Sequence, residues 1–255
     1  MKKTLIASAL IAAFAAPAFA ADAAPAEHTV TGNFGVFSSY RFRGIDQTFG
    51  KPAIQGGVDY SHSSGLYLGN WNSNVSSGAG YPEGNLEMDF YGGYKTTFGD
   101  IGLDVGALYY YYPGSKATKV NAAKSGTVSN TELYVGTSWK FLTLKYSRAV
   151  SDYFEAARSK GTSYLDLSAN YDLGNGWGVN AHVGHLKFKN DSNYSYTDYK
   201  VGVTKEIGAG WVAGLSYVDT NAKKAFYTAT SSFGGTGDTK FLGRGITVLS
   251  VSKTF

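Results

Sequence analysis

Residues 163–188, SYLDLSANYDLGNGWGVNAHVGHLKF, decide the fold because apolar and polar side chains alternate on both sides of a short turn. Leu165 and Leu167 alternate with Asp166 before the turn, and the same period of two returns after it. On a β-strand, side chains two residues apart share a face. The stretch therefore predicts two antiparallel strands, each with one apolar and one polar face, joined by the glycine-rich turn at 174–176.

The same alternation continues through most of residues 29–255 and predicts about twelve strands. The predicted strands span residues 29–43, 52–62, 66–75, 85–98, 101–112, 130–139, 142–151, 162–173, 177–188, 195–207, 211–221 and 244–255. Neither an internal repeat nor a domain linker interrupts the pattern. We therefore predict a single domain over residues 29–255.

The connections between these strands alternate in length. Short turns are predicted at residues 63–64, 99–100, 140–141, 174–176 and 208–210. Longer loops are predicted at residues 44–51, 76–84, 113–129, 152–161, 189–194 and 222–243. Short turns at one end and long loops at the other are typical of outer-membrane β-barrels. The predicted fold class is therefore all-β, a transmembrane antiparallel β-barrel with short periplasmic turns, longer extracellular loops and both termini on the periplasmic side.

The composition of the 255 residues agrees with many strands joined by turns, since 33 residues are glycine, 15% are aromatic and only 5 are proline. The chain has no cysteine, which excludes disulfides and Cys-based zinc, iron–sulfur or thiol chemistry. The formal net charge of +4 is too mild to indicate a nucleic-acid-binding protein. We therefore expect no cofactor and no nucleic-acid partner.

Residues 1–20 have the features of a cleaved secretory signal peptide. Two lysines give a positive start, residues 5–16 form an apolar run, and a small-x-small cleavage site ends at Ala20. The sequence therefore predicts secretion through the inner membrane of a Gram-negative bacterium. Residues 21–28 are predicted to be the flexible N-terminus of the mature chain.

Alternation alone does not say which face of the barrel meets lipid, because a soluble barrel would put the apolar face inside. Aromatic side chains beside the short turns favour lipid outside, since such residues form a girdle at a membrane interface. The predicted periplasmic aromatic girdle contains Phe98, Trp139, Phe141, Trp177 and Trp211. Charges along the whole length of the polar faces favour the same orientation, because a wet lumen tolerates them and hydrocarbon does not.

The last predicted strand ends the chain on Phe255, after Leu249 and Val251 alternate with polar residues. A terminal aromatic residue on an amphipathic strand resembles the signal that the barrel-assembly machinery reads. Lys253 departs from the usual apolar residue, but close to the interface its side chain can reach water. We therefore predict Phe255 as the assembly signal. The expected partners are the secretion and barrel-assembly machinery, outer-membrane lipid and lipopolysaccharide.

Residues 39–75 carry three short motifs: YxFRGxxQ at 40–47, QGG at 55–57 and GxYxGxWxSN at 65–74. This stretch resembles the opening of the Gcw_chp or TorF family of porin-like proteins, and the resemblance extends over most of the mature chain. It implies an outer-membrane barrel with a pore role. The resemblance brings no established substrate and no catalytic residue.

The polar faces of the predicted strands supply candidate pore-lining residues. They are Arg41, Arg43, Gln55, Asp59, Asn70, Asn72, Asn74, Glu87, Asp89, Lys95, Asp104, Glu132, Lys145, Asp166, His182, Asp198 and Lys200. Lys95 and Asp104 are predicted to face each other across a short turn, either as a structural ion pair or as a selectivity element. Four of the candidates, Gln55, Asn70, Asn72 and Asn74, predict an amide-rich wall that would hydrogen-bond water, sugars or nucleosides.

Arg41 and Arg43 are predicted on the polar face of the first strand, which places Tyr40 and Phe42 on its lipid face. As a basic strip near the outer mouth, the two arginines would bias anion passage. Alternatively, they pair with wall acids such as Asp59 and stiffen the barrel. The run of four tyrosines at 109–112 predicts two side chains outside and two in the lumen.

His182 invites two readings that the spacing does not support. Ser168 and Asp166 lie across the predicted hairpin from it, as in a catalytic triad, but neither an oxyanion donor nor a strained elbow is evident. His182 and His185 are spaced like a metal-binding pair, but residues three apart on a strand point to opposite faces. We therefore predict no catalytic and no metal site.

The predicted function is a porin-like channel for passive diffusion of small polar solutes or ions in the bacterial outer membrane, not an enzyme. Two alternatives remain. One is a closed structural or adhesive barrel whose long loops bind partners. The other is an outer-membrane lipid hydrolase of the phospholipase type.

Overall fold

Twelve strands close into one antiparallel β-barrel in the computed structural model, which describes residues 26–79, 83–230 and 237–255. The barrel strands are β1 (His28–Phe37), β4 (Ala53–His62), β5 (Leu66–Asn74), β6 (Leu86–Phe98), β7 (Ile101–Tyr111), β8 (Ser129–Trp139), β9 (Leu142–Ala149), β10 (Ser163–Gly174), β11 (Trp177–Lys187), β12 (Tyr196–Gly208), β13 (Trp211–Thr220) and β16 (Ile246–Thr254). Each strand pairs with the next one along the wall, and β16 closes the barrel on β1. The predicted fold class and strand number are confirmed. The predicted signal peptide lies outside the described residues.

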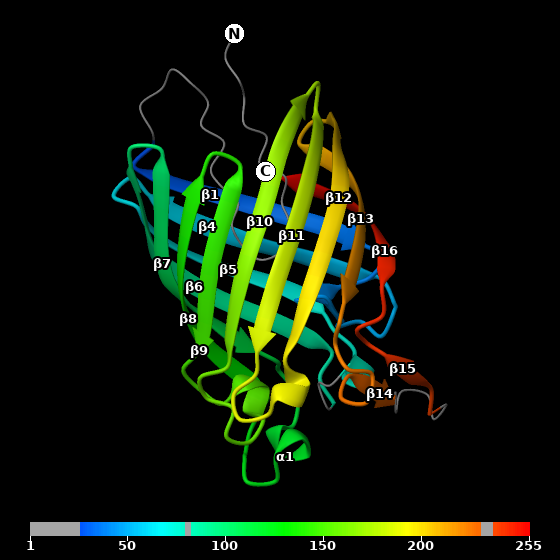
Figure 1. The fold of residues 1–255 in the computed structure, drawn as a ribbon. Coiled ribbons are helices and arrows are strands. Elements are labelled where there is room, and N and C mark those ends of the chain that lie inside the picture. Colours follow the sequence, from blue (N-terminus) through cyan, green and yellow to red (C-terminus); the bar gives the residue numbers. More distant parts are fainter. Residues whose placement is uncertain (1–25, 80–82, 231–236) are drawn as a thin grey trace.

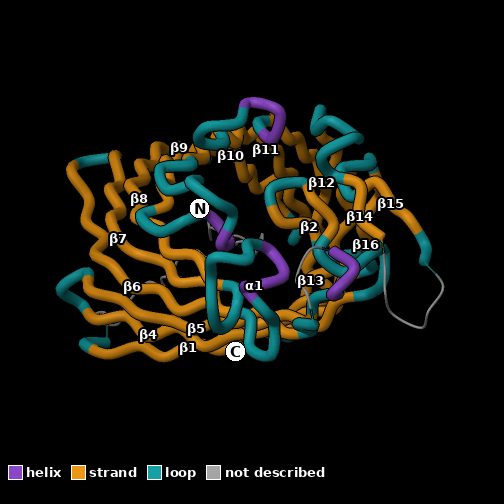
Figure 2. The backbone as a smooth tube through the Cα atoms, turned by 90° about the horizontal axis from the view of Figure 1, so that it is seen from below, coloured by secondary structure: helices purple, strands orange, loops and turns teal. Residues whose placement is uncertain are grey.

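The two ends of the barrel differ, as the loop lengths predict. At the short-turn end, drawn at the top of Figure 1, tight turns join β4 to β5, β6 to β7, β8 to β9, β10 to β11 and β12 to β13. The opposite, long-loop end carries the short helix α1 (Ala117–Val120), the 3-10 turns η1 (Ser77–Ala79), η2 (Tyr153–Glu155) and η3 (Ser192–Tyr194), and the ribbon of β14 (Thr228–Thr230) and β15 (Thr239–Phe241). Seen from that end in Figure 2, loops lie across the mouth of the barrel.

The barrel is apolar outside and polar inside, the reverse of a soluble protein. Outward side chains such as Val30, Leu68 and Val201 are 68%, 60% and 60% exposed. Inward carboxylates such as Glu87 and Glu132 are buried. A closed wall with an apolar exterior suits lipid. Every barrel strand is paired on both sides, and the charged side chains are kept away from hydrocarbon. Among the described residues, none of the helices has the length and apolar character that a membrane crossing requires.

The first strand is shorter than predicted. β1 ends at Phe37, and the chain then turns into the barrel as a small hairpin of β2 (Arg41–Phe42) and β3 (Ile45–Asp46). The turn of this hairpin needs left-handed backbone at two successive residues, with φ of 48° at Arg43 and 78° at Gly44. Glycine adopts this conformation without strain. The alternation of apolar and polar residues continues to residue 43 in the sequence, but the strand itself ends before the hairpin. We call residues 39–48 the inward hairpin.

Candidate functional site in the barrel lumen

The inward hairpin lies inside the barrel near its long-loop end. Ser39, Tyr40, Gln47 and Thr48 are each no more than 3% exposed, and Asp46 is fully buried. Arg41 pairs with Asp46 across the two short strands, and Phe42 pairs with Ile45. The hairpin therefore narrows the lumen with side chains that the sequence alone places on the wall.

Arg43 fastens the hairpin to the opposite wall. Its guanidinium donates two hydrogen bonds to the Glu132 carboxylate on β8, at 3.0 and 2.7 Å, and a third to the Tyr153 hydroxyl at 3.0 Å. Its Cζ atom also lies 4.3 Å from the centre of the Tyr164 ring. Paired donors on a planar carboxylate form a strong, directional contact, which cation–π contact reinforces. Of the two readings of Arg43, this geometry favours a structural partner of a wall acid, although that acid is Glu132 and not Asp59.

Arg41 and Tyr40 connect the hairpin to the last long loop and to β6. Arg41 donates to the backbone carbonyls of Leu242 and Arg244, at 2.9 and 3.1 Å, in the last long loop. The Tyr40 hydroxyl donates to Glu87 at 3.2 Å, and its ring meets Trp71 edge-on at 5.5 Å between centroids. The expectation that Tyr40 and Phe42 face lipid is wrong, because the chain leaves the wall before these residues.

Twelve of the predicted polar wall residues lie on the inner face of the barrel. These residues are Gln55, Asp59, Glu87, Asp89, Lys95, Asp104, Glu132, Lys145, Asp166, His182, Asp198 and Lys200. The register sets Lys95 opposite Asp104, as predicted. Asp104 accepts a hydrogen bond from the Tyr67 hydroxyl at 2.6 Å, and the Lys95 ammonium lies 4.6 Å from the Tyr67 ring centre.

Inward tyrosines are the residues that sequence reasoning missed. Tyr67, Tyr134 and Tyr164 bridge wall charges: the Tyr67 and Tyr134 hydroxyls contact each other, and the Tyr164 hydroxyl donates to Asp198 at 2.9 Å. Their positions on the polar side of each alternating strand carried the signal. Tyrosine supplies both an apolar ring and a polar tip, so it suits a partly hydrated interior.

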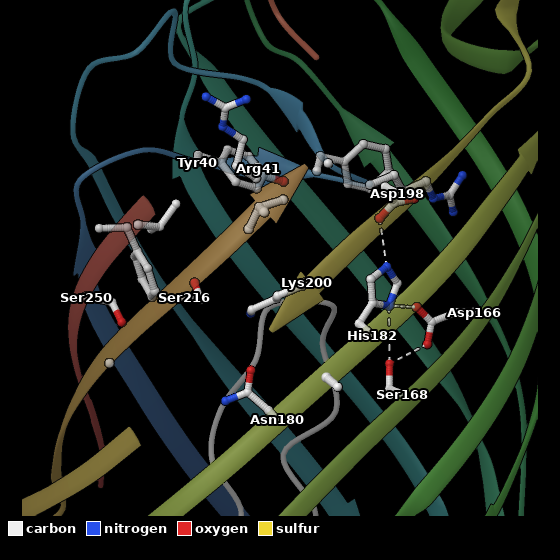
Figure 3. Close-up of a pocket in the computed structure, with 18 of the residues that line it drawn as sticks. Tyr40, Arg41, Asp166, Ser168, Asn180, His182, Asp198, Lys200, Ser216 and Ser250 are labelled. Atoms are coloured by element: carbon white, nitrogen blue, oxygen red, sulfur yellow. Dashed lines mark hydrogen bonds and ion pairs between the residues drawn. The ribbon is translucent and has the colours of Figure 1, made fainter. Parts of the chain in front are cut away.

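His182 sits at the centre of a carboxylate cluster on the wall of β10, β11 and β12 (Figure 3). Its Nε2 atom lies 2.7 Å from an Asp198 oxygen, and its Nδ1 atom contacts Asp166. Ser168 donates to Asp166 at 2.6 Å, while its hydroxyl is 3.4 Å from His182 Nδ1. Both imidazole nitrogens therefore face carboxylates, and the histidine is poorly placed to take a proton from the serine.

A cavity of about 310 Å³ lies between the inward hairpin and the wall of β11, β12, β13 and β16. Lys200, Asn180, Ser216 and Ser250 surround it in Figure 3. The side-chain amide oxygen of Asn180 (Oδ1) is buried without a hydrogen-bond partner among the described residues. Arg41 and Arg43 of the hairpin and the carboxylates of Asp89, Asp166 and Asp198 also line the cavity, so it offers hydrogen bonds and charges of both signs to a polar solute.

A family match extends over nearly the whole chain. The model of a family described as a bacterial protein of unknown function, Gcw_chp, matches residues 20–255. The chain belongs to the Gcw_chp family. The resemblance carried by residues 39–75 is thus confirmed for the family. No curated protein matches the sequence significantly.

Solved porin structures resemble the fold of this Gcw_chp protein. The KdgM porin aligns with a TM-score of 0.53 at 9% identity, covering 88% of this chain and 98% of that chain. A structure of the KdgM porin in complex with disordered oligogalacturonate gives 0.53 at 8% identity, covering 89% and 97%. The NanC porin gives 0.53 at 10% identity, covering 89% and 99%. At such low identity the likeness is one of barrel architecture alone.

The amide wall predicted for the Gcw_chp protein is only partly inside the barrel. Gln55 faces the lumen and donates to the Ser73 hydroxyl at 3.2 Å. Asn70, Asn72 and Asn74 lie on the outer face of β5, because Trp71 and Ser73 take the inner positions. Their prediction as pore-lining residues is therefore wrong. Hydrogen bonds satisfy these outward amides: Asn70 donates to the Asp89 carbonyl, Asn72 to the Asn70 side chain and Asn74 to the Pro52 carbonyl.

Other outward residues of the Gcw_chp protein lie where the sequence places them. Four girdle residues, Phe98, Trp139, Phe141 and Trp177, are exposed beside the short turns. Trp211 is half-buried, and the Lys253 ammonium lies 5.4 Å from its ring centre. Tyr110 and Tyr112 are buried inside, while Tyr109 is exposed on the outer face.

Proposed function

We propose that this Gcw_chp protein is an outer-membrane channel for passive diffusion of small polar solutes or ions. The observation that carries the proposal is the cavity of about 310 Å³ that lies between the inward hairpin and a polar wall, inside a barrel with an apolar exterior. Such a barrel lowers the barrier to polar solutes by hydrating them and by the field of its wall charges. The porin-like fold agrees with this role.

The inward hairpin would set the size limit of this channel. A twelve-stranded barrel lies between small barrels filled by side chains and wide porins with open lumens. The cavity is lined on one side by Tyr40 and Arg41 and on the other by Lys200, Ser216 and Ser250. A solute would therefore pass between a side-chain-held hairpin and a rigid wall. The oligogalacturonate bound in the KdgM complex agrees with a polar solute class but identifies no solute for this chain.

The orientation that we propose puts the long loops outside the cell and the short turns in the periplasm. Loop-length asymmetry supports it. Reporter tags in residues 113–129 should be accessible on intact cells, whereas tags at residues 99–100 should not. Surface labelling of the short turn would contradict the orientation.

We also propose that Phe255 is read during assembly. Its backbone pairs with Gly32 through hydrogen bonds of 2.6 and 2.9 Å, and its side chain is 71% exposed. An exposed aromatic group at the end of the closing strand is available to an assembly factor. Deleting Phe255 should lower the amount of folded, heat-modifiable barrel in the membrane, and normal levels would count against this role.

Planar-bilayer conductance of the purified full-length protein tests the channel. We expect discrete current steps that scale with bulk conductivity, and larger steps when residues 39–48 are replaced by a glycine–serine linker of equal length. The linker variant must keep the heat-modifiable gel migration of a folded barrel. Absence of steps from both folded proteins would overturn the proposal.

A closed barrel whose loops bind partners is the second candidate, and the tight seating of the inward hairpin favours it. Arg43 and Glu132 are both buried, so the hairpin is held as firmly as a core element. In this case only the linker variant should conduct. Steps from the unaltered protein would exclude a permanently closed barrel.

A lipid hydrolase is not supported by the geometry at His182. A serine nucleophile needs a base that accepts its proton, and here Ser168 donates to Asp166 while His182 is held between two carboxylates. We therefore propose no enzymatic activity. Hydrolysis of phospholipid or lipopolysaccharide by the folded protein would contradict this.

A further inference from the structure

Two histidines meet on the outside of the barrel at its short-turn end. His28 is the first residue of β1 and His62 is the last residue of β4, and the register of the two strands sets them directly opposite each other. Their ring centroids are 5.1 Å apart. Directly opposed side chains on neighbouring strands are close enough to share one ligand.

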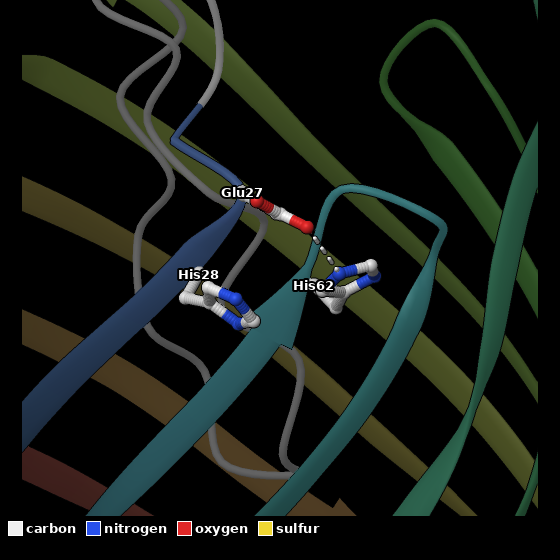
Figure 4. A group of neighbouring side chains, drawn as sticks. All are labelled: Glu27, His28 and His62. Atoms are coloured by element: carbon white, nitrogen blue, oxygen red, sulfur yellow. Dashed lines mark ion pairs between the residues drawn. The ribbon is translucent and has the colours of Figure 1, made fainter.

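Glu27 completes a group of three (Figure 4). Its carboxylate lies 3.6 Å from Nε2 of His62. Neighbours on a strand point to opposite faces, so Glu27 could not join His28 if β1 began one residue earlier. It stands in a bend before the strand, and its carbonyl accepts a hydrogen bond of 2.9 Å from Ser63 N–H in the β4–β5 turn. One ligand atom from each of Glu27, His28 and His62 lies within 4.8 Å of the other two.

Hydroxyl groups contact the far nitrogen of each ring. His28 Nδ1 lies 2.8 Å from the Tyr60 hydroxyl, and His62 Nδ1 lies 2.7 Å from the Ser64 hydroxyl. Nδ1 of His62 also accepts a hydrogen bond of 3.1 Å from the Ser64 N–H, so a metal at Nε2 would require the ring proton to move to Nδ1, where it faces the Ser64 hydroxyl. The Nε2 atoms of His28 and His62 would then act as the ligands. A histidine that binds a metal usually forms a hydrogen bond through its other ring nitrogen, which fixes its orientation and tautomer.

We propose that Glu27, His28 and His62 bind one divalent transition-metal ion of the zinc type. Two imidazoles and a carboxylate are ligands that zinc accepts in a tetrahedral site, with water in the fourth position. Imidazole nitrogen also suits copper and nickel, whereas magnesium and calcium prefer oxygen ligands. The site lies outside the lumen, so it does not depend on the proposed channel function.

The bound ion would fasten the start of the chain's first strand to the β4–β5 turn. A ligand that binds only the folded state raises its stability in proportion to the logarithm of ligand concentration. Without metal, the Glu27 carboxylate faces His62 Nε2 alone, at 3.6 Å. The metal site needs His28 as a ligand, whereas the pair of Glu27 and His62 does not involve His28.

Zinc titration of the full-length barrel in detergent micelles tests the site, with cobalt as a spectroscopic probe. We expect one zinc ion per chain and visible cobalt absorption of the intensity typical of tetrahedral coordination. His28→Gln and His62→Gln should each weaken binding by more than about tenfold, the loss that even an outer-shell change can cause. Ser64→Ala, which removes only a supporting hydroxyl, should weaken it less.

The matched control is His185→Gln. His185 is also exposed on the outer face of a strand and contacts a hydroxyl, with its Nδ1 2.9 Å from Thr197 Oγ1. The chain has four histidines and no cysteine, so competing sites are few. We expect His185→Gln to bind zinc as the unaltered chain does, and zinc to raise the unfolding temperature of both. Unchanged zinc affinity in a folded His28→Gln/His62→Gln double variant, or no zinc binding by the unaltered chain, would overturn the proposal.

Discussion

In the barrel wall, continuous ladders of backbone hydrogen bonds join each strand to two neighbours, whereas the inward hairpin is held mainly by side chains from distant parts of the chain. For example, the ladder between β10 and β11 runs from the pair Ser163–Lys187 to the pair Gly174–Trp177. The hairpin has two backbone hydrogen bonds to other loops, Asp46 N–H to Leu242 and Ser76 N–H to Gln47. Side-chain contacts supply the rest: those of Tyr40, Arg41 and Arg43, the packing of Phe42 against Tyr110 and Phe154, and an ion pair of 3.4 Å between Asp46 and Lys240.

This difference separates the stability of the barrel from the closure of its lumen. A backbone ladder tolerates most side-chain changes, because the hydrogen bonds do not depend on residue type. A buried ion pair depends on both partners, since removal of one leaves the other unpaired. We therefore expect single substitutions to release the hairpin while the wall stays folded.

Arg43→Gln should have the largest effect. It leaves Glu132 buried without its cation, and docking of the hairpin should weaken by about 3–5 kcal/mol. Hydrogen exchange of residues 39–48 should rise sharply and channel conductance should increase, with little change in exchange of β10 and β11. Lys95→Gln is the control in the wall: it removes a cation that lies opposite Asp104 and against the Tyr67 ring, and it should leave exchange of residues 39–48 unchanged. Equal protection of the hairpin from hydrogen exchange in both variants would contradict the claim that the hairpin depends on Arg43.

Gly44→Ala should act next most strongly, by a route that involves no charge. Its φ of 78° strains any other residue, and an added Cβ would lie 2.7 Å from Asp198 Cβ. Strain and crowding together should cost about 1–3 kcal/mol and loosen the hairpin. Gly174→Ala is the control, because its φ of 83° is similar but no atom lies within 4 Å of the added Cβ. The fall in unfolding temperature of the two variants measures the difference, and an equal fall in both would show that crowding is unimportant. Exchange of residues 39–48 should rise in Gly44→Ala alone.

The same two regions mark how far the sequence predicts this structure. Strand positions follow from the period of two, because side chains along a barrel strand point alternately to lipid and to the lumen. The inward hairpin does not follow, since the alternation of Val36, Tyr40 and Phe42 continues past the end of β1. Contacts with residues far along the chain, such as that of Arg43 with Glu132, 89 residues away, reveal that the segment turns inward.

Which side chains of a strand point into the lumen was harder to predict than where the strand lies in the sequence. β5 carries aromatic side chains at Tyr67 and Trp71 on one face and leucines followed by amides on the other, so both faces mix apolar with polar groups. Residue type then favoured the wrong face for Asn70. The group at His28 and His62 was missed because the two residues are 34 positions apart, and only the β1–β4 register brings them together.

Lys200→Gln tests the wall as the surface that sets selectivity. Lys200 faces the cavity from β12, and its removal should shift the reversal potential under a salt gradient toward cations. The shift should shrink as salt rises, because the Debye length falls to about 8 Å at physiological ionic strength. Lys253→Gln removes the same charge from the outer face and should leave the potential unchanged. An equal shift in both variants would mean that net charge, not the lumen, sets the preference.

The smallest expected effect is a pH dependence of the loop that supports the hairpin. Tyr153, which accepts a hydrogen bond from Arg43, follows Asp152 in this loop. The Lys124 ammonium lies 2.8 Å from the Asp152 carboxylate and, with the amide N–H groups of Ser159 and Lys160, holds the pKa of that carboxyl below its ordinary value of 3.8.

A carboxyl whose pKa is lowered by folding stabilises the folded loop above the unfolded pKa and loses this contribution as pH falls through the lower, folded value. Protease cleavage within residues 150–162 should therefore stay slow at pH 5 and accelerate below about pH 4. Asp152→Asn removes the titrating group, so its cleavage should already be faster at pH 5 and should depend less on pH. The change should be small, because Asp152 lies near the surface and salt screens its pair with Lys124. If the loop loosens in acid while residues 39–48 stay protected, the inward hairpin is held by Glu132 without help from Tyr153. If both loosen together, the hairpin and its supporting loop open as one unit.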